Sequence, residues 1–255
     1  MDPILYAEYQ QFENRHWWFV GVREIIFNFL KTALKPKEAD ITRRKNPRIL
    51  DAGCGTGQFL PGLSKMGKVV GADFSRSALR ILKGKGFRNV IQADIQSLPF
   101  PPGQFDLVCA ISLLEHMEND ALTLQELTRV ARPGGFLAVT VPAYPFLWGD
   151  QDRLGHHYRR YTVSGLQDLL AGAGLTAVRF TFFGTAVFPI GLAVRKLRSG
   201  LARLFPGLRS VSDFSYSAPP GLNQLFLLIM RLEKRWLRRF QFPFGLMIFI
   251  LAEKR

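Results

Sequence analysis

Cysteine and long apolar runs, the marks of secreted and membrane-spanning proteins, are scarce in this 255-residue sequence. Its two cysteines, Cys54 and Cys109, form neither a disulfide framework nor a CxxC metal pattern, which predicts a reducing compartment and no metal site. The uncharged stretch 180–194 is shorter than the roughly 20 residues that span a bilayer. Residues 1–18 lack a basic segment followed by a cleavable apolar one, so we expect no signal peptide.

Acidic residues are also few, with 20 Asp and Glu against 34 Lys and Arg. The imbalance is concentrated in residues 179–255, where thirteen basic residues face three acids. Basic side chains that alternate with Phe, Leu and Trp favour an anionic membrane surface or lipid as partner. Nucleic acid is the competing interpretation. The sequence lacks a known nucleic-acid motif and is very apolar between its charges, so we expect no nucleic-acid partner.

Short apolar runs alternate with helical patterns through residue 141. This alternation predicts an α/β fold with a parallel, doubly wound sheet. Ligands of such sheets bind beyond the carboxyl ends of the strands. Expected strands are 48–52, 68–72, 88–93, 105–111, 135–141, 175–183 and 244–254. Expected helices are 57–66, 75–84, one within 119–130, and one from Thr162 to Gly172.

The segment 50–57, Leu-Asp-Ala-Gly-Cys-Gly-Thr-Gly, joins the first expected strand to a helix. Its glycines allow a tight turn close to a ligand, and the first amides of the helix would face that ligand. Asp73, at the end of the second strand, can accept hydrogen bonds from both ribose hydroxyls. A dinucleotide fingerprint would need glycine where Gln58 stands, and Asp51 would repel a pyrophosphate. An acid there suits an ammonium or sulfonium ligand; a turn without a ligand is the alternative.

These residues resemble the first motif of class I S-adenosylmethionine-dependent methyltransferases, in particular those of type 11/12 from bacterial polysaccharide and lipid gene neighbourhoods. The resemblance implies S-adenosylmethionine as cofactor and a doubly wound seven-stranded, Rossmann-like sheet whose last strand is antiparallel. In this chain the fold would carry an N-terminal helical cap and a helical insertion between the last two strands. The expected division is 1–47 for the cap, 48–183 with 241–255 for the core, and 184–240 for the insertion.

The resemblance also assigns cofactor-binding residues at the strand ends. The family's acid for the adenine amino group falls on Asp94, with Ile95 beside the ring; a turn cap is the alternative role for Asp94. Residues after the fourth strand line the methyl end of the cofactor in relatives. The full expected set is Asp51, Gly53, Cys54, Gly55, Gly57, Asp73, Phe74, Asp94, Ile95, Ile111 and Ser112.

The loop 141–162 gathers aromatic, histidine and arginine side chains at the same edge. A histidine can remove the proton of an acceptor hydroxyl near neutral pH, and an arginine pair can hold a phosphate or carboxylate. The catalytic candidates are His116, His156 and His157. The substrate-binding candidates are Trp18, Tyr144, Trp148, Arg159, Arg160 and Tyr161. The alternative is a purely structural loop over the active site.

Residues 195–205 and 222–240 read as basic amphipathic helices. We expect them to lie on a membrane or to line a lipid-binding groove; an ordinary helical subdomain or a homodimer face is the alternative. The expected function is methylation of an oxygen, less favourably a nitrogen or carbon, of a lipidic or lipid-linked acceptor (glycan, isoprenoid quinone or fatty acid). The expected location is cytoplasmic, peripheral on the inner face of the cell membrane. A methyltransferase for a soluble small molecule and a noncatalytic scaffold remain as alternatives.

Overall fold

The computed structural model describes residues 11–34, 44–204 and 219–255. Its strands are β1 (Arg48–Ala52), β2 (Lys68–Asp73), β3 (Val90–Gln92), β4 (Phe105–Ile111), β5 (Ala131–Pro142), β6 (Leu175–Phe183) and β7 (Met247–Lys254). Its helices are α2 (Trp17–Ala33), α3 (Leu60–Leu63), α4 (Arg76–Gly84), α5 (Asp120–Val130), α6 (Asp150–Leu154), α7 (Val163–Gly172), α8 (Phe188–Leu204) and α9 (Pro220–Trp236), with short 3-10 turns η2 (Leu114–His116) and η3 (Pro145–Leu147).

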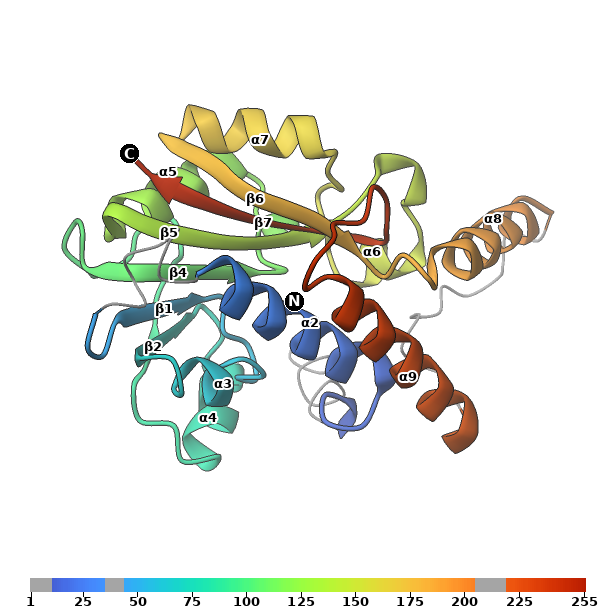
Figure 1. Ribbon diagram of the computed structural model, residues 1–255, viewed down its shortest axis with the longest axis horizontal. Helices are drawn as coiled ribbons and strands as arrows, with labels where there is room; N and C mark the ends of the chain where they lie inside the picture. The colour runs from blue at the N-terminus through green and yellow to red at the C-terminus, as the bar shows by residue number, and fades with distance from the viewer. Residues whose placement is uncertain (1–10, 35–43, 205–218) are drawn as a thin grey trace.

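The seven strands form one sheet in the order β3-β2-β1-β4-β5-β7-β6 (Figure 1). Strands β1 to β5 pair in parallel, while β7 lies antiparallel between β5 and β6. This is the predicted doubly wound sheet with an antiparallel last strand. The carboxyl ends of the parallel strands therefore meet at one edge, which carries the glycine turn, Asp73 and the loop after β5.

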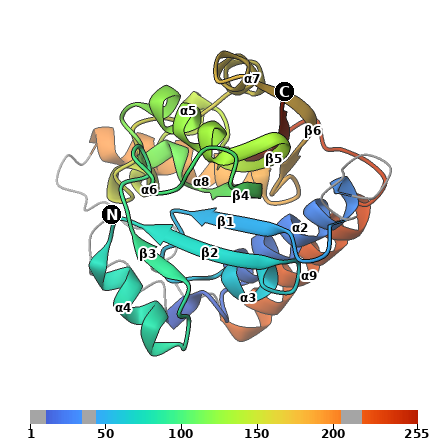
Figure 2. The same ribbon diagram turned by 90° about the vertical axis from the view of Figure 1, so that its left-hand side faces the viewer.

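Successive strand residues point to opposite faces of the sheet, and each face has its own apolar core. On one face Leu50 and Val108 pack with side chains of α5 and α7. On the other, Ile49 and Leu107 pack with Ile25 and other residues of α2. Figure 2 shows α5 and α7 on one side of the sheet and α2, α3 and α9 on the other. The strands that carry the site are thus buried on both faces.

Helix α3 and strand β5 depart most clearly from their predicted bounds, while β3 (Val90–Gln92) and β7 (Met247–Lys254) are shorter than the predicted 88–93 and 244–254. Helix α3 covers only Leu60–Leu63 instead of 57–66, because the glycine turn continues through Gly57 and a proline follows at position 61. Strand β5 begins at Ala131, four residues before the predicted start at 135, because Ala131 pairs with Phe105 before the register shifts. The sheet edge is otherwise placed as the sequence predicts.

The insertion between β6 and β7 contains α8 and α9, with residues 205–218 outside the described ranges. Helix α9 packs along α2: Met230 fills the space above Gly21, and Glu24 pairs with Arg231 and Lys234. Helix α8 extends away from the sheet (Figure 1). Among the described helices, none combines the length and the apolar character needed to cross a bilayer. The division into cap, core and insertion stays a prediction.

Candidate cofactor and acceptor site

The turn after β1 depends on its glycines. Gly53, Gly55 and Gly57 have φ angles of 70°, 51° and 84°, a left-handed region that other residues rarely adopt. A Cβ at Gly57 would lie 2.2 Å from the Leu82 side chain, and one at Gly53 would lie 2.8 Å from Leu113. The turn is therefore both left-handed and closely packed, as the spacing predicts.

The amides of this turn are used within the protein. Gly53 and Cys54 donate to the carbonyl of Ala72 at 2.8 and 3.0 Å, and Gly55 donates to Oδ2 of Asp73 at 2.8 Å. The helix expected at 57–66 begins only at Leu60, and the prediction that the first amides of this helix face the ligand stays a prediction. Beside these engaged amides stand two carboxyl groups, those of Asp51 and Asp73.

Asp51 is the most exceptional of these carboxyl groups. It is 2% exposed, and its Oδ2 atom has no hydrogen-bond partner. Burial, and then the negative charge of Asp73, raise the pKa of Asp51 to about 7. A buried carboxylate oxygen without a partner is costly unless a ligand satisfies it. The ammonium or sulfonium group of S-adenosylmethionine has the matching charge, so the residues present fit this cofactor.

Asp73 has a structural role at the end of β2 and is the predicted ribose-binding residue. Its two oxygens accept from the amides of Gly55 and Ser75, each at 2.8 Å, which fixes the carboxylate at the strand end. Burial raises its pKa, and these two hydrogen bonds oppose that shift. Each carboxylate oxygen has a further lone pair. Ribose hydroxyls can use these without displacing the turn.

The remaining predicted cofactor residues fall into two groups. Phe74 and Asp94 are exposed at the edge, and Oδ1 of Asp94 accepts from the amide of Gln96 at 2.9 Å, a turn cap that leaves Oδ2 for a ligand. The side chains of Cys54 and Ile95 belong to the apolar cores, so only their backbones can face the edge. Burial raises the pKa of the Cys54 thiol, which keeps it neutral.

Ile111 and Ser112 end β4 as predicted. Ile111 packs against the core on the α2 side. Ser112 has a φ of 50°, and its amide donates to the Thr140 carbonyl at 3.1 Å, which turns the chain sharply at the strand end. That turn delivers Glu115 and His116 to the edge on η2.

The loop after β5 is organised by Asp152, a buried carboxylate. It accepts from the Arg160 guanidinium at 2.8 Å and from the Gly149 amide at 2.8 Å, and Arg195 of α8 lies 3.3 Å away. Its Oδ1 also lies 3.0 Å from Nδ1 of His157. Burial alone would raise the pKa of Asp152, but these partners hold it well below its usual range. Asp152 therefore stays ionised and fixes three side chains.

The predicted arginine pair is engaged by the protein itself. Arg160 is 9% exposed and bonds Asp152 and the Ala143 carbonyl. Arg159 pairs with Asp120 at 2.9 Å and donates to the Glu118 carbonyl. Tyr161 is also buried, and its hydroxyl donates to Asp120 at 2.8 Å. These three side chains frame the loop, which differs from the expectation of a free anion clamp.

The predicted histidines separate. His156 is exposed on a left-handed residue, whereas the rings of His116 and His157 meet edge to face with centroids 4.7 Å apart. Burial and the neighbouring His157 lower the pKa of His116 to about 3. Glu115, to which the sequence analysis gave no role, lies beside them with a side chain 2% exposed. The sequence did carry a signal for Glu115: it follows a Ser-Leu pair by two residues, just after a buried strand.

An aromatic cluster lies at the same edge beyond β5 and β6. Tyr144 stacks on Phe146 and Phe182 with ring centroids 5.1 and 5.4 Å apart, and Phe188 contacts both Tyr144 and Phe244. Trp18 stacks on Phe183 nearby, at the end of β6. Trp148 is half-buried in the loop. Of the predicted substrate-binding side chains, Tyr144 and Trp18 therefore join apolar surfaces.

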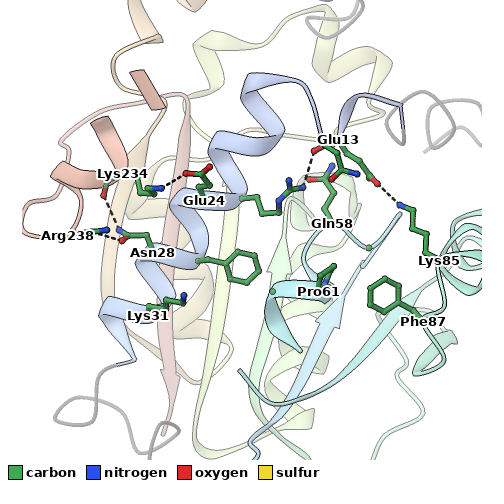
Figure 3. Close-up of a pocket in the computed structure, with 15 residues that line it drawn as sticks. Glu13, Glu24, Asn28, Lys31, Gln58, Pro61, Lys85, Phe87, Lys234 and Arg238 are labelled. Atoms are coloured by element: carbon green, nitrogen blue, oxygen red, sulfur yellow. Dashed lines mark hydrogen bonds and ion pairs between the residues drawn. The ribbon is translucent and has the colours of Figure 1, made fainter. Parts of the chain in front are cut away.

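Two cavities lie in the part of the chain that the structure describes around the glycine turn and the strand ends. One, of about 610 Å³, lies at the strand edge and is lined by Gln96, His116, Asp120 and Arg159 among others. The other, of about 600 Å³, lies between α2 and the outer side of the glycine turn (Figure 3). There Glu13 bonds Thr56 and Lys85, and Glu24 pairs with Lys234. The first cavity reaches from Gln96, two residues after Asp94, to His116, and is the better place for reacting groups.

Comparison with known proteins points to one family. Residues 50–139 match the model of a methyltransferase domain. The chain is 34% identical over 180 residues to a demethylmenaquinone methyltransferase of Anoxybacillus flavithermus, an alignment that covers 67% of this chain and 68% of the relative. It is 38% identical over 96 residues to a tRNA (carboxymethyluridine(34)-5-O)-methyltransferase of Arabidopsis thaliana, covering 36% of this chain and only 23% of the relative.

Among solved structures, a SAM-dependent methyltransferase from Archaeoglobus fulgidus superposes with a TM-score of 0.58 at 19% identity, covering 96% of this chain and 99% of that one. This likeness shows the fold, including the order of the strands and the antiparallel β7. The glycine turn with its orphaned acid, the sheet and the sequence matches agree. The chain belongs to the class I S-adenosylmethionine-dependent methyltransferases.

Proposed function

We propose that this protein transfers a methyl group from S-adenosylmethionine to an oxygen of a lipidic or lipid-linked acceptor, working at the inner face of the cell membrane. The observation that carries the membrane part is an exposed apolar stripe on α9. Its members are 42% to 54% exposed and recur every three or four residues, on one side of the helix: Leu222, Leu225, Leu228, Leu232, Trp236 and, just after the helix, Phe240.

The opposite side of α9 is the side that packs against the rest of the protein. Met230, Glu233 and Leu237 are buried there, with Met230 against α2 and Glu233 accepting from the amide of Gly184 at 2.6 Å. The helix is thus already packed on one side. An apolar surface of this length on the other side is typical of a membrane or partner contact.

Charge favours an anionic bilayer as that contact. Arg235 and Arg239 are exposed next to the stripe, as they are in helices that lie in a membrane interface. On α8, Ile190, Val194 and Leu197 are exposed in the same pattern, interrupted by basic residues. The relatives named demethylmenaquinone methyltransferases act, by that name, on a quinone, which supports an apolar acceptor here.

The groups proposed to take part in the reaction lie at the strand-end edge. S-adenosylmethionine supplies, when bound, a methyl group on a sulfonium that leaves as a thioether as the acceptor oxygen attacks and loses its proton. Asp51 and Asp73 would hold its amino acid and ribose parts, and Asp94 its adenine. Positioning supplies most of the catalysis, because the donor is already activated. The aromatic cluster around Tyr144 offers an apolar wall for the acceptor.

Vesicle flotation tests this proposal. We expect the full chain to float with vesicles rich in phosphatidylglycerol and not with phosphatidylcholine alone. Replacing Leu225, Leu228 and Leu232 together by serine should weaken binding by ~100-fold or more, since burying each half-exposed leucine contributes about 1 kcal/mol. The control is Leu122→Ser, because this leucine is 42% exposed on α5, away from the stripe.

Equal flotation of the triple variant and the wild type would contradict the proposal. A dimer in sedimentation that the same triple variant dissolves, with no vesicle binding by the wild type, would instead favour a soluble acceptor and a homodimer face. A noncatalytic scaffold predicts no binding of S-adenosylhomocysteine by calorimetry. The unpaired Asp51 oxygen argues for such binding.

A further inference from the structure

Three side chains near the end of β4 form an arrangement that neither the fold nor the cofactor requires. One ligand-type atom from each of Glu115, His116 and His157 lies within 4.8 Å of the other two. Two of them come from η2 and the third from the loop after α6, forty-one positions later in the chain. The apolar core does not need these groups at this place, because leucine or phenylalanine would fill the space at lower cost.

Two atoms of this cluster are buried without a hydrogen-bond partner. They are Oε2 of Glu115 and Nδ1 of His116. Buried acceptor atoms in native proteins nearly always have a partner, so these two atoms, which belong to neighbouring residues, are available to a bound group.

The third member is oriented by a carboxylate behind it. Nδ1 of His157 lies 3.0 Å from Oδ1 of the ionised Asp152, so this nitrogen carries the proton and donates. Its Nε2 then has a free lone pair. A carboxylate behind a histidine is the arrangement that orients metal-binding imidazoles in proteins. Arg160 and Arg195 hold Asp152 in turn, so the orientation is rigid.

We propose that Glu115, His116 and His157 bind a divalent transition-metal ion, zinc being the closest match. Two imidazoles and one carboxylate with an open position form a donor set that such ions prefer over magnesium or calcium. The cavity of about 610 Å³ reaches His116, which gives the ion a path and leaves room for an oxygen ligand. Bond lengths near 2.1 Å require the three side chains to close slightly around the ion.

The use of the ion rests on the proposed function. The Ser112 turn that relatives use to line the methyl end of the cofactor lies three residues before Glu115. An acceptor hydroxyl bound to the ion would therefore be held beside the methyl group. The ion lowers the pKa of that hydroxyl, so its proton leaves to solvent through the cavity and the oxygen becomes a better nucleophile.

The test measures metal binding directly, so it does not depend on an acceptor. The full chain, stripped with EDTA, is titrated with zinc chloride by calorimetry, and bound zinc is counted by mass spectrometry after dialysis. We expect one zinc per chain in the wild type. Glu115→Gln and His157→Ala should each weaken binding by ~100-fold or more. Glutamine keeps the shape of the neutral buried carboxyl, so the first variant should stay folded.

The matched control is His156→Asn, which removes the neighbouring exposed histidine and keeps a residue that tolerates its left-handed backbone. This variant should bind zinc as the wild type does. No stoichiometric zinc in the wild type, or equal loss in the control, would overturn the metal site. The same samples are titrated with S-adenosylhomocysteine: binding there without zinc binding rejects this inference alone, and failure of both rejects the proposed function as well.

Discussion

The strand-end edge of this protein has a donor half, around Asp51 and Asp73, and an acceptor half, around Glu115 and Asp152. Each half pairs one hydrogen-bonded acid with one acid that has an unpaired oxygen. In the donor half, Asp73 is bonded by two backbone amides while the neighbouring Asp51 keeps a buried oxygen unpaired. In the acceptor half, Asp152 is surrounded by donors while Glu115 keeps an oxygen unpaired. Each half thus has one acid, here called the frame acid, that fixes its neighbours by hydrogen bonds, and one acid with a buried oxygen that is available to a ligand. Replacing a frame acid and replacing an unpaired acid should therefore have opposite effects on stability.

The largest expected effect comes from removing the frame acid of the acceptor half. Asp152→Ala leaves the buried guanidinium of Arg160 without its carboxylate, which should lower the free energy of unfolding by about 3–5 kcal/mol. Urea denaturation followed by circular dichroism measures this loss. The control Asp150→Ala touches a salt bridge with Arg153, whose guanidinium is exposed, and should cost less than about 1 kcal/mol. Similar losses in the two variants would remove the frame role of Asp152.

The next effect concerns cofactor binding in the donor half. Asp73→Asn replaces a charged acceptor at the ribose position, so the affinity for S-adenosylhomocysteine should fall by about 2–3 kcal/mol, or ~30- to 150-fold. Calorimetry at pH 7.5 measures it, with Asp168→Asn on α7 as control. Unchanged affinity would show that the ribose is held elsewhere.

A pH-dependent effect concerns the unpaired acid Asp51, and it has the opposite sign. The pKa of Asp51 is raised in the folded protein to about 7, above its ordinary value of 3.8. Its contribution to stability is therefore complete below pH 4 and is lost as the pH rises through 7, by up to ~1.4 kcal/mol per pH unit. We expect the cofactor-free wild type to lose stability over this range.

Asp51→Asn should flatten that dependence and be at least as stable as the wild type at pH 8, while it binds S-adenosylhomocysteine more weakly. Thermal unfolding between pH 5 and 8, with and without S-adenosylhomocysteine, checks both statements. If the variant were much less stable than the wild type at pH 8, Asp51 would belong to the frame.

Sequence alone predicted the sheet closely because its signals are local. Ile49 and Leu50 before a glycine turn, and Val69 and Val70 before Asp73, mark buried strands by hydrophobicity and turn chemistry. The bounds of β1, β4 and β6 are those predicted, and those of β2 differ by one residue. Helix α3 was predicted too long, since helical periodicity does not reveal how far a left-handed turn extends.

The site was harder to predict because its partners are distant in the chain. Arg160 was expected to hold substrate, and nothing local shows that Asp152 occupies it. Glu115 and His157 lie forty-two positions apart, so only the fold shows that they meet. Likewise α9 read correctly as amphipathic, but its sequence does not say that one side packs on α2 and leaves the leucines outside.

One consequence follows from the amides of the glycine turn. Because the amides of Gly53, Cys54 and Gly55 all donate within the protein, these three cannot bind phosphate oxygens, and Asp51 adds negative charge beside them. Nucleotides such as ATP or NAD share the adenine and ribose of the methyl donor but carry phosphates where it carries a cation. They should therefore compete poorly for this site, however abundant they are. Selectivity against phosphate-bearing nucleotides would thus come from backbone amides that are already engaged within the protein.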